Sequence, residues 1–196
     1  KEIAVPEGFY SSKFIVDKAI QQLENNQKNH QEQRKPFFSF VSFLAVHIPV
    51  QAPKEFTEQY IGSYRDGWHA LRKNRQNAVK DLGLIPANAS MKRMAATDDW
   101  DDLSEEEKRY SDKRMSVYAG MVDAMDHHIG RLIQYLKESG QYDNTVIIFT
   151  SDNGPAAGDV PLLWINALGY NRDYETLGER YSYGTIGASF GSAVAS

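Results

Sequence analysis

The sequence of 196 residues contains no cysteine, no excess of positive charge and no apolar run of the about 20 residues that a membrane-spanning helix needs. Without cysteine the chain cannot form a disulfide, a thiolate metal site or a cysteine nucleophile. Its 22 Lys and Arg residues against 26 Asp and Glu residues give a formal net charge of −4. This balance predicts no basic face for nucleic acid.

The residues that are present suit a folded protein with a core of its own. Hydrophobic residues make up 41% of the chain and aromatic residues 12%. Two strongly apolar runs lie at 37–44 and at 145–150, and each is flanked by residues that end a strand. Runs of this kind are typical of strands that are buried on both faces of a parallel sheet. We therefore predict an α/β fold, a mostly parallel sheet with helices on both faces.

Polar residues follow the second run directly. Asp152, Asn153 and Gly154 come after the apolar residues of 145–150, at the carboxyl end of the predicted strand. Ligands of open α/β sheets usually bind at that edge. A carboxylate and a carboxamide oxygen are hard ligands of the type that Ca²⁺ or Mg²⁺ prefers. The alternative is that Asp-Asn-Gly is only turn chemistry after a strand.

A histidine follows the first run in the same way. His47 comes after 37–44, and Pro49 and Pro53 stop the strand there, because proline cannot donate to a ladder. The pattern predicts a histidine held on a stiff turn above the sheet. A histidine with a purely structural role is the alternative.

Three helices are indicated by apolar periodicity, at about 13–26, from Asp66 to Gly83, and from Ser104 to Gly140. Ser104 and Glu107 form a capping box at the start of the last one. That helix would cross over between the two strands with a right-handed connection. Residues 155–196 show no sustained period and are expected to make a long excursion over the sheet.

Taken in order, AVHIPVQAP, the helix containing YAGMVDAMDHHIGRLIQYLKESG, and IIFTSDNG resemble the middle of a type I sulfatase, of the arylsulfatase branch of the alkaline-phosphatase superfamily. The resemblance covers nearly the whole chain. It implies a sulfuric ester hydrolase with one bound Ca²⁺, with Asp152 and Asn153 as metal ligands. It also implies that His47 contacts the ester and helps the leaving group depart.

Some parts of the family pattern are missing from this sequence. The C/S-x-P-x-R motif that gives the formylglycine nucleophile is absent, so no nucleophile is assigned. Asp101 and Asp102 are the only candidates for the family's first metal-binding pair, and they precede a helix instead of following a strand. We therefore expect residues 1–196 to be a single partial catalytic domain, an internal fragment that is inactive by itself.

Two other functions stay open at this stage. One is a phosphomonoester, phosphodiester or phosphonate hydrolase of the same superfamily, and the other is a non-catalytic, degenerate sulfatase-like binding module. The resemblance implies a sulfated small molecule or saccharide as the substrate, and it favours a periplasmic or secreted parent protein. The sequence determines neither the ester nor the oligomeric state, because one fold can serve many substrates.

Overall fold

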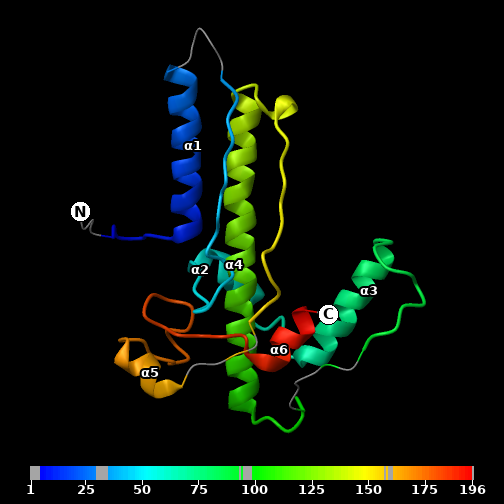
Figure 1. Ribbon diagram of the computed structural model, residues 1–196. Coiled ribbons are helices and arrows are strands. Elements are labelled where there is room, and N and C mark those ends of the chain that lie inside the picture. Colours follow the sequence, from blue (N-terminus) through cyan, green and yellow to red (C-terminus); the bar gives the residue numbers. More distant parts are fainter. Residues whose placement is uncertain are drawn as a thin grey trace. The chain divides into compact units, whose positions relative to one another are not determined.

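The computed structural model describes residues 5–29, 35–92, 94, 99–156, 158 and 161–195. Its helices are shown in Figure 1 and are, in chain order, α1 (Ser11–Asn29), α2 (Lys54–Thr57), η1 (Glu58–Tyr60), α3 (Gly67–Asp81), α4 (Glu105–Glu138), η2 (Tyr142–Asn144), α5 (Leu162–Ala167) and α6 (Gly187–Val194). No helix within these ranges is both long enough and apolar enough to cross a membrane. The chain divides into two compact units, one of residues 1–46 and 122–150 and the other of residues 47–121 and 151–196.

In the first unit, α1 packs against the second part of α4. The predicted apolar stripe of α1 is confirmed, since Val16 is fully buried and Leu23 is 5% exposed. Arg131 of α4 donates a hydrogen bond to the Asp17 carboxylate of α1 over 2.6 Å, and the two side chains form an ion pair. A charged pair of this kind fixes the register of two helices more than it stabilises them, because both groups remain partly in water.

The two runs predicted as buried strands are extended chain without strand partners, so the mostly parallel sheet is not confirmed in the described residues. Figure 1 draws 37–44 and 145–150 as loops along the first unit. Within the described part, no backbone hydrogen bond joins 37–44 to 146–149. Phe38 is 93% exposed and Ile148 is 83% exposed, although both were expected in a core. A strand needs a neighbour to pair with its backbone, and neither segment has one among the residues described in this unit.

The prediction for the start of α4 is confirmed atom by atom. The Ser104 backbone N–H donates to Glu107 Oε2 over 2.9 Å, and the Glu107 backbone N–H donates to Ser104 Oγ over 3.3 Å. These two bonds are the reciprocal pair of a capping box, and they satisfy amides that the first turn leaves without partners. The hydrogen bonds to Glu107 also lower the pKa of its carboxyl.

The second unit has an aromatic core between α3 and α6. Trp68 lies edge-on to Trp100, with ring centroids 4.8 Å apart at 90°, and edge-on to Phe190, at 5.6 Å and 89°. Phe190 is fully buried in α6. The sequence predicted α3 but not α6, because residues 155–196 show no sustained apolar period.

Gly67 makes the close packing of this core possible. Its φ of +79° is a conformation that glycine adopts readily, and a Cβ at this position would lie 2.4 Å from Trp100 Cδ2. We expect Gly67→Ala to lower the free energy of unfolding by about 2–4 kcal/mol, from backbone strain together with overpacking. Guanidinium unfolding followed by far-ultraviolet circular dichroism measures this change.

Gly83→Ala is the matched control for Gly67→Ala. Gly83 has a similar φ of +70°, but a Cβ there would meet nothing within 4 Å. This variant should therefore lose only the backbone part, about 1–2 kcal/mol. Equal losses for the two variants would contradict the role given to the Gly67–Trp100 contact.

Candidate functional site

His47 lies in a turn, as predicted, and its side chain is exposed. The imidazole Nδ1 lies 2.7 Å from the carbonyl oxygen of Ile48. A carbonyl oxygen can only accept, so Nδ1 carries the hydrogen in this bond. Nε2 is then the ring atom left for a substrate, and in the imidazolium form it is a proton donor. The turn thus engages Nδ1 of the imidazole, and Nε2 makes no hydrogen bond to the described residues.

The chain is firmly held directly after His47. The Val50 backbone N–H donates to the carbonyl of Gly184 over 2.9 Å, and the Ala52 N–H donates to the carbonyl of Gly178 over 3.1 Å. Val50 is fully buried. These two hydrogen bonds were not predicted from the sequence. The only local signal for them is the glycine content of 155–196, because glycine allows close backbone approach.

Asp152 and Asn153 form an exposed turn of their own. Asp152 Oδ1 accepts the backbone N–H of Asn153 over 2.9 Å, and Asn153 Nδ2 donates to the carbonyl of Gly154 over 2.7 Å. Ser151 Oγ donates to the carbonyl of Asn153 over 2.7 Å. Asp152 Oδ2 and Asn153 Oδ1 are the side-chain oxygens left over by these bonds. This donor set suits Ca²⁺, which takes six to eight oxygen ligands, and it supplies part of such a shell.

The three predicted site residues belong to the same compact unit, which comprises 47–121 and 151–196. Each of them makes its described hydrogen bonds within its own turn. In the described ranges no group of three or more His, Asp or Glu residues is placed to hold a metal ion. Within the described residues, the Asp152–Asn153 turn therefore offers two side-chain oxygens and no complete metal shell.

Among the described residues, the acidic side chains just before α4 belong to no metal-binding group. Asp101 and Asp102 are exposed, and the Asp101 backbone N–H donates to the Asp99 carboxylate over 3.2 Å. They lie just before the first turn of α4, which starts at Glu105. Negative charge is favourable at that end of a helix.

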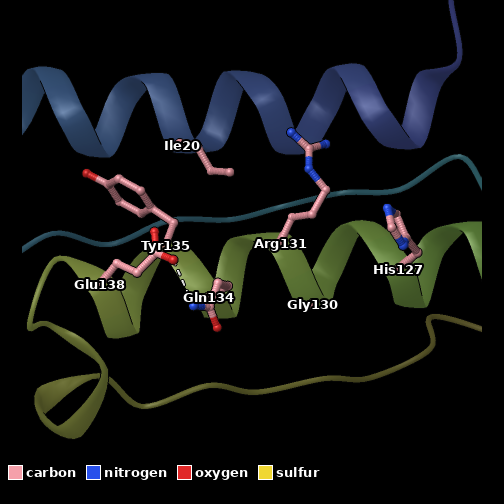
Figure 2. Close-up of a pocket in the computed structure, with 7 residues that line it drawn as sticks. All are labelled: Ile20, His127, Gly130, Arg131, Gln134, Tyr135 and Glu138. Atoms are coloured by element: carbon pink, nitrogen blue, oxygen red, sulfur yellow. Dashed lines mark hydrogen bonds between the residues drawn. The ribbon is translucent and has the colours of Figure 1, made fainter.

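A groove lies between α1 and α4 in the first unit. Figure 2 shows the Arg131 side chain extending from α4 toward α1 inside it, and its lining residues are Ile20, His127, Gly130, Arg131, Gln134, Tyr135 and Glu138. Arg131 is already paired with Asp17, whose carboxylate also pairs with Lys13. Burial, and then the Arg131 guanidinium, lower the pKa of the adjacent His128. The groove is best explained as helix packing.

The comparisons with known proteins agree with one another. The Sulfatase family model matches residues 2–177. An uncharacterized sulfatase of Schizosaccharomyces pombe is 48% identical over 155 residues, which is 78% of this chain and 27% of that protein. The arylsulfatase of Klebsiella aerogenes is 30% identical over 193 residues, 95% of this chain and 40% of that protein. The multifunctional alkaline phosphatase superfamily protein PehA of Trinickia caryophylli is 27% identical over 185 residues, 88% of this chain and 32% of that protein.

Proposed function

This chain belongs to the sulfatase family, of the alkaline-phosphatase superfamily, and on that premise we propose that it is part of a hydrolase that cleaves sulfate esters with a bound calcium ion. It spans between about a quarter and two fifths of the length of these relatives, so the activity is that of a longer protein. One observation carries the proposal. The family match from residue 2 to residue 177 includes both turns of the candidate site.

In this proposal His47 is the general acid. Its Nδ1–H is engaged by the Ile48 carbonyl, so in the imidazolium form Nε2 would donate its proton to the ester oxygen. As the sulfur–oxygen bond breaks, that oxygen takes the proton from Nε2 and leaves as a neutral alcohol or phenol. Positioned proton donors contribute about 10²–10⁴-fold to such reactions. The nucleophile is supplied by residues outside this chain, which has no cysteine and no C/S-x-P-x-R motif.

Asp152 and Asn153 would hold the calcium ion through one carboxylate and one carboxamide oxygen. When bound, the ion would neutralise negative charge on the sulfate oxygens. The exposure of both side chains and their separate turn support this role, because a ligand for a metal must be free to reach it. The other calcium ligands would come from the rest of the protein.

We further propose that 37–44 and 145–150 are strands of the mostly parallel sheet predicted from the sequence, and that residues 1–196 are part of one catalytic domain. The support lies in their exposed side chains, among them Phe38 and Phe40 in one segment and Val146 and Ile148 in the other. Stable soluble monomers usually cover long runs of exposed apolar side chains. The rest of the longer protein would supply the neighbouring strands and cover these faces.

A phosphate or phosphonate ester is the second candidate substrate, and the similarity to PehA favours it. The non-catalytic module has less support, since a free-standing module would not expose two apolar segments to water. By analogy with the family we place the longer protein in the periplasm or outside the cell.

Hydrolysis of 4-nitrophenyl sulfate tests the proposed function. The full-length protein should cleave it in the presence of Ca²⁺ and lose this activity in a chelator, whereas the 196-residue chain alone should be inactive. The same assay with 4-nitrophenyl phosphate and a phosphonate monoester compares the candidate substrates. Faster cleavage of a phosphorus ester would replace the sulfatase assignment, and activity of the isolated chain would mean that it carries a nucleophile of its own.

A further inference from the structure

The segment Val50–Ala52 packs closely against the 178–184 loop and forms backbone hydrogen bonds with it. Gly178 has a φ of +97°, and a Cβ on it would lie 2.7 Å from Val117 Cγ2. A Cβ on Gly184 would lie 2.9 Å from Val50 Cγ2. The two glycines thus bring their carbonyls close enough to accept the N–H groups of Val50 and Ala52. Close packing on both sides leaves this segment little freedom.

Gln51 joins the same loop through its side chain. Its Nε2 donates to the carbonyl of Ser182 over 2.8 Å, and its backbone N–H contacts Met121 Sδ at 3.3 Å. Ser182 is fully buried, and its Oγ accepts the Gly178 N–H over 2.9 Å. The loop bound by Gln51 is therefore itself closed by a buried hydrogen bond.

The base of the loop is closed by a second set of bonds. The Asn171 backbone N–H donates to the carbonyl of Tyr181 over 2.9 Å, and the Tyr183 N–H donates to the carbonyl of Asn171 over 2.7 Å. Asn171 Oδ1 accepts the Thr176 hydroxyl over 2.8 Å. The acceptor of Gln51 therefore lies in a loop whose own shape is fixed.

From these contacts we infer that Gln51 is a positioning residue for His47, acting through the 178–184 loop. This inference rests on the proposed function of His47. Ile48 and Pro49 alone separate His47 from the buried Val50, so the turn moves when its anchor moves. A general acid must reach the leaving oxygen within hydrogen-bonding distance. A displacement of about 1 Å can cost on the order of 10²-fold in rate.

We expect Gln51→Met in the full-length protein to lower kcat/KM for an alkyl sulfate by about 10–100-fold, because the amide donor is lost while the length of the side chain is kept. An aryl sulfate with a good leaving group should lose less than about threefold, since its leaving group needs little proton transfer. In combination with His47→Ala, the Gln51 variant should cause little further loss, because both changes act on the same proton.

Gln76→Met is the matched control. Gln76 Nε2 also donates to a backbone carbonyl, that of Ala89, over 3.0 Å, but it lies in α3 and not next to the His47 turn. This variant should leave the ratio of alkyl to aryl sulfate hydrolysis unchanged. If Gln51→Met fails to fold, Gln51→Glu removes the same donor with a polar side chain of the same length.

Hydrogen–deuterium exchange gives a readout that does not depend on activity. The amides of 47–52 should exchange faster in Gln51→Met than in the unchanged protein, and at the unchanged rate in Gln76→Met. Unchanged exchange in Gln51→Met, or equal losses on both classes of sulfate, would overturn the inference. A His47→Ala variant that keeps full activity, together with faster exchange in Gln51→Met, would instead contradict the proposed role of His47 while leaving the anchor in place.

Discussion

Replacing His47 by alanine in the full-length protein should lower kcat/KM for an alkyl sulfate by about 10²–10⁴-fold. The bond between His47 Nδ1 and the Ile48 carbonyl leaves Nε2 as the proton donor, and alanine removes that donor altogether. Alcohols are poor leaving groups unless they are protonated as the bond breaks, so the loss should grow as the leaving group becomes more basic. Steady-state kinetics on a series of alkyl and aryl sulfates measures this dependence.

His69→Ala is the control for the removal of an imidazole. His69 is exposed on α3, and it lies in the same compact unit as His47. Its replacement should leave all the rates within about twofold, as is usual for surface substitutions. A loss in His47→Ala that is the same for every leaving group would point to a role in substrate binding instead of proton donation.

Replacing Asp152 by asparagine should weaken Ca²⁺ binding by the full-length protein and lower kcat/KM for aryl sulfates by about 10²-fold or more at limiting Ca²⁺. The change keeps the size of the side chain and its acceptor for the Asn153 N–H, but it removes the negative charge. Because charge count sets calcium affinity, excess Ca²⁺ should restore part of the activity.

Calorimetric titration with Ca²⁺ and assays over a range of Ca²⁺ concentrations measure both parts of this prediction. Asp143→Asn serves as the comparison, since Asp143 is an exposed acid in η2 at the other end of the same apolar run. It should bind Ca²⁺ as the unchanged protein does. Unaltered Ca²⁺ affinity in Asp152→Asn would remove Asp152 from the metal shell.

The three longest helices, α1, α3 and α4, could be predicted from the sequence because their signals are local. The capping box of Ser104 and Glu107 and the stripe containing Val16 and Leu23 lie within a few turns of chain, and the structure contains both. His47 and Asp152 were predicted in turns that follow two strands. Both residues lie in turns, where proline and glycine limit the backbone, but the strands are not confirmed in the described residues.

What could not be predicted depends on partners that are distant in sequence. Arg131 of α4 pairs with Asp17 of α1, 114 residues away in the sequence. The apolar run 145–150 indicates a strand, but it says nothing about which segment pairs with it. The hydrogen bond from Gln51 to the 178–184 loop has no periodic signature in the sequence, because the loop residues that form and support it are glycine and serine.

The aromatic core also gives the protein an optical property. The chain has three tryptophans. Trp68 and Trp100 of the core are 2% and 7% exposed and lie edge to face, whereas Trp164 in α5 is 65% exposed. The buried indole pair is close enough for its electronic transitions to couple, and water-soluble quenchers such as iodide reach only Trp164. Emission that iodide quenches therefore reports on α5, and emission that survives reports on the contact between α3 and α6, without any added label.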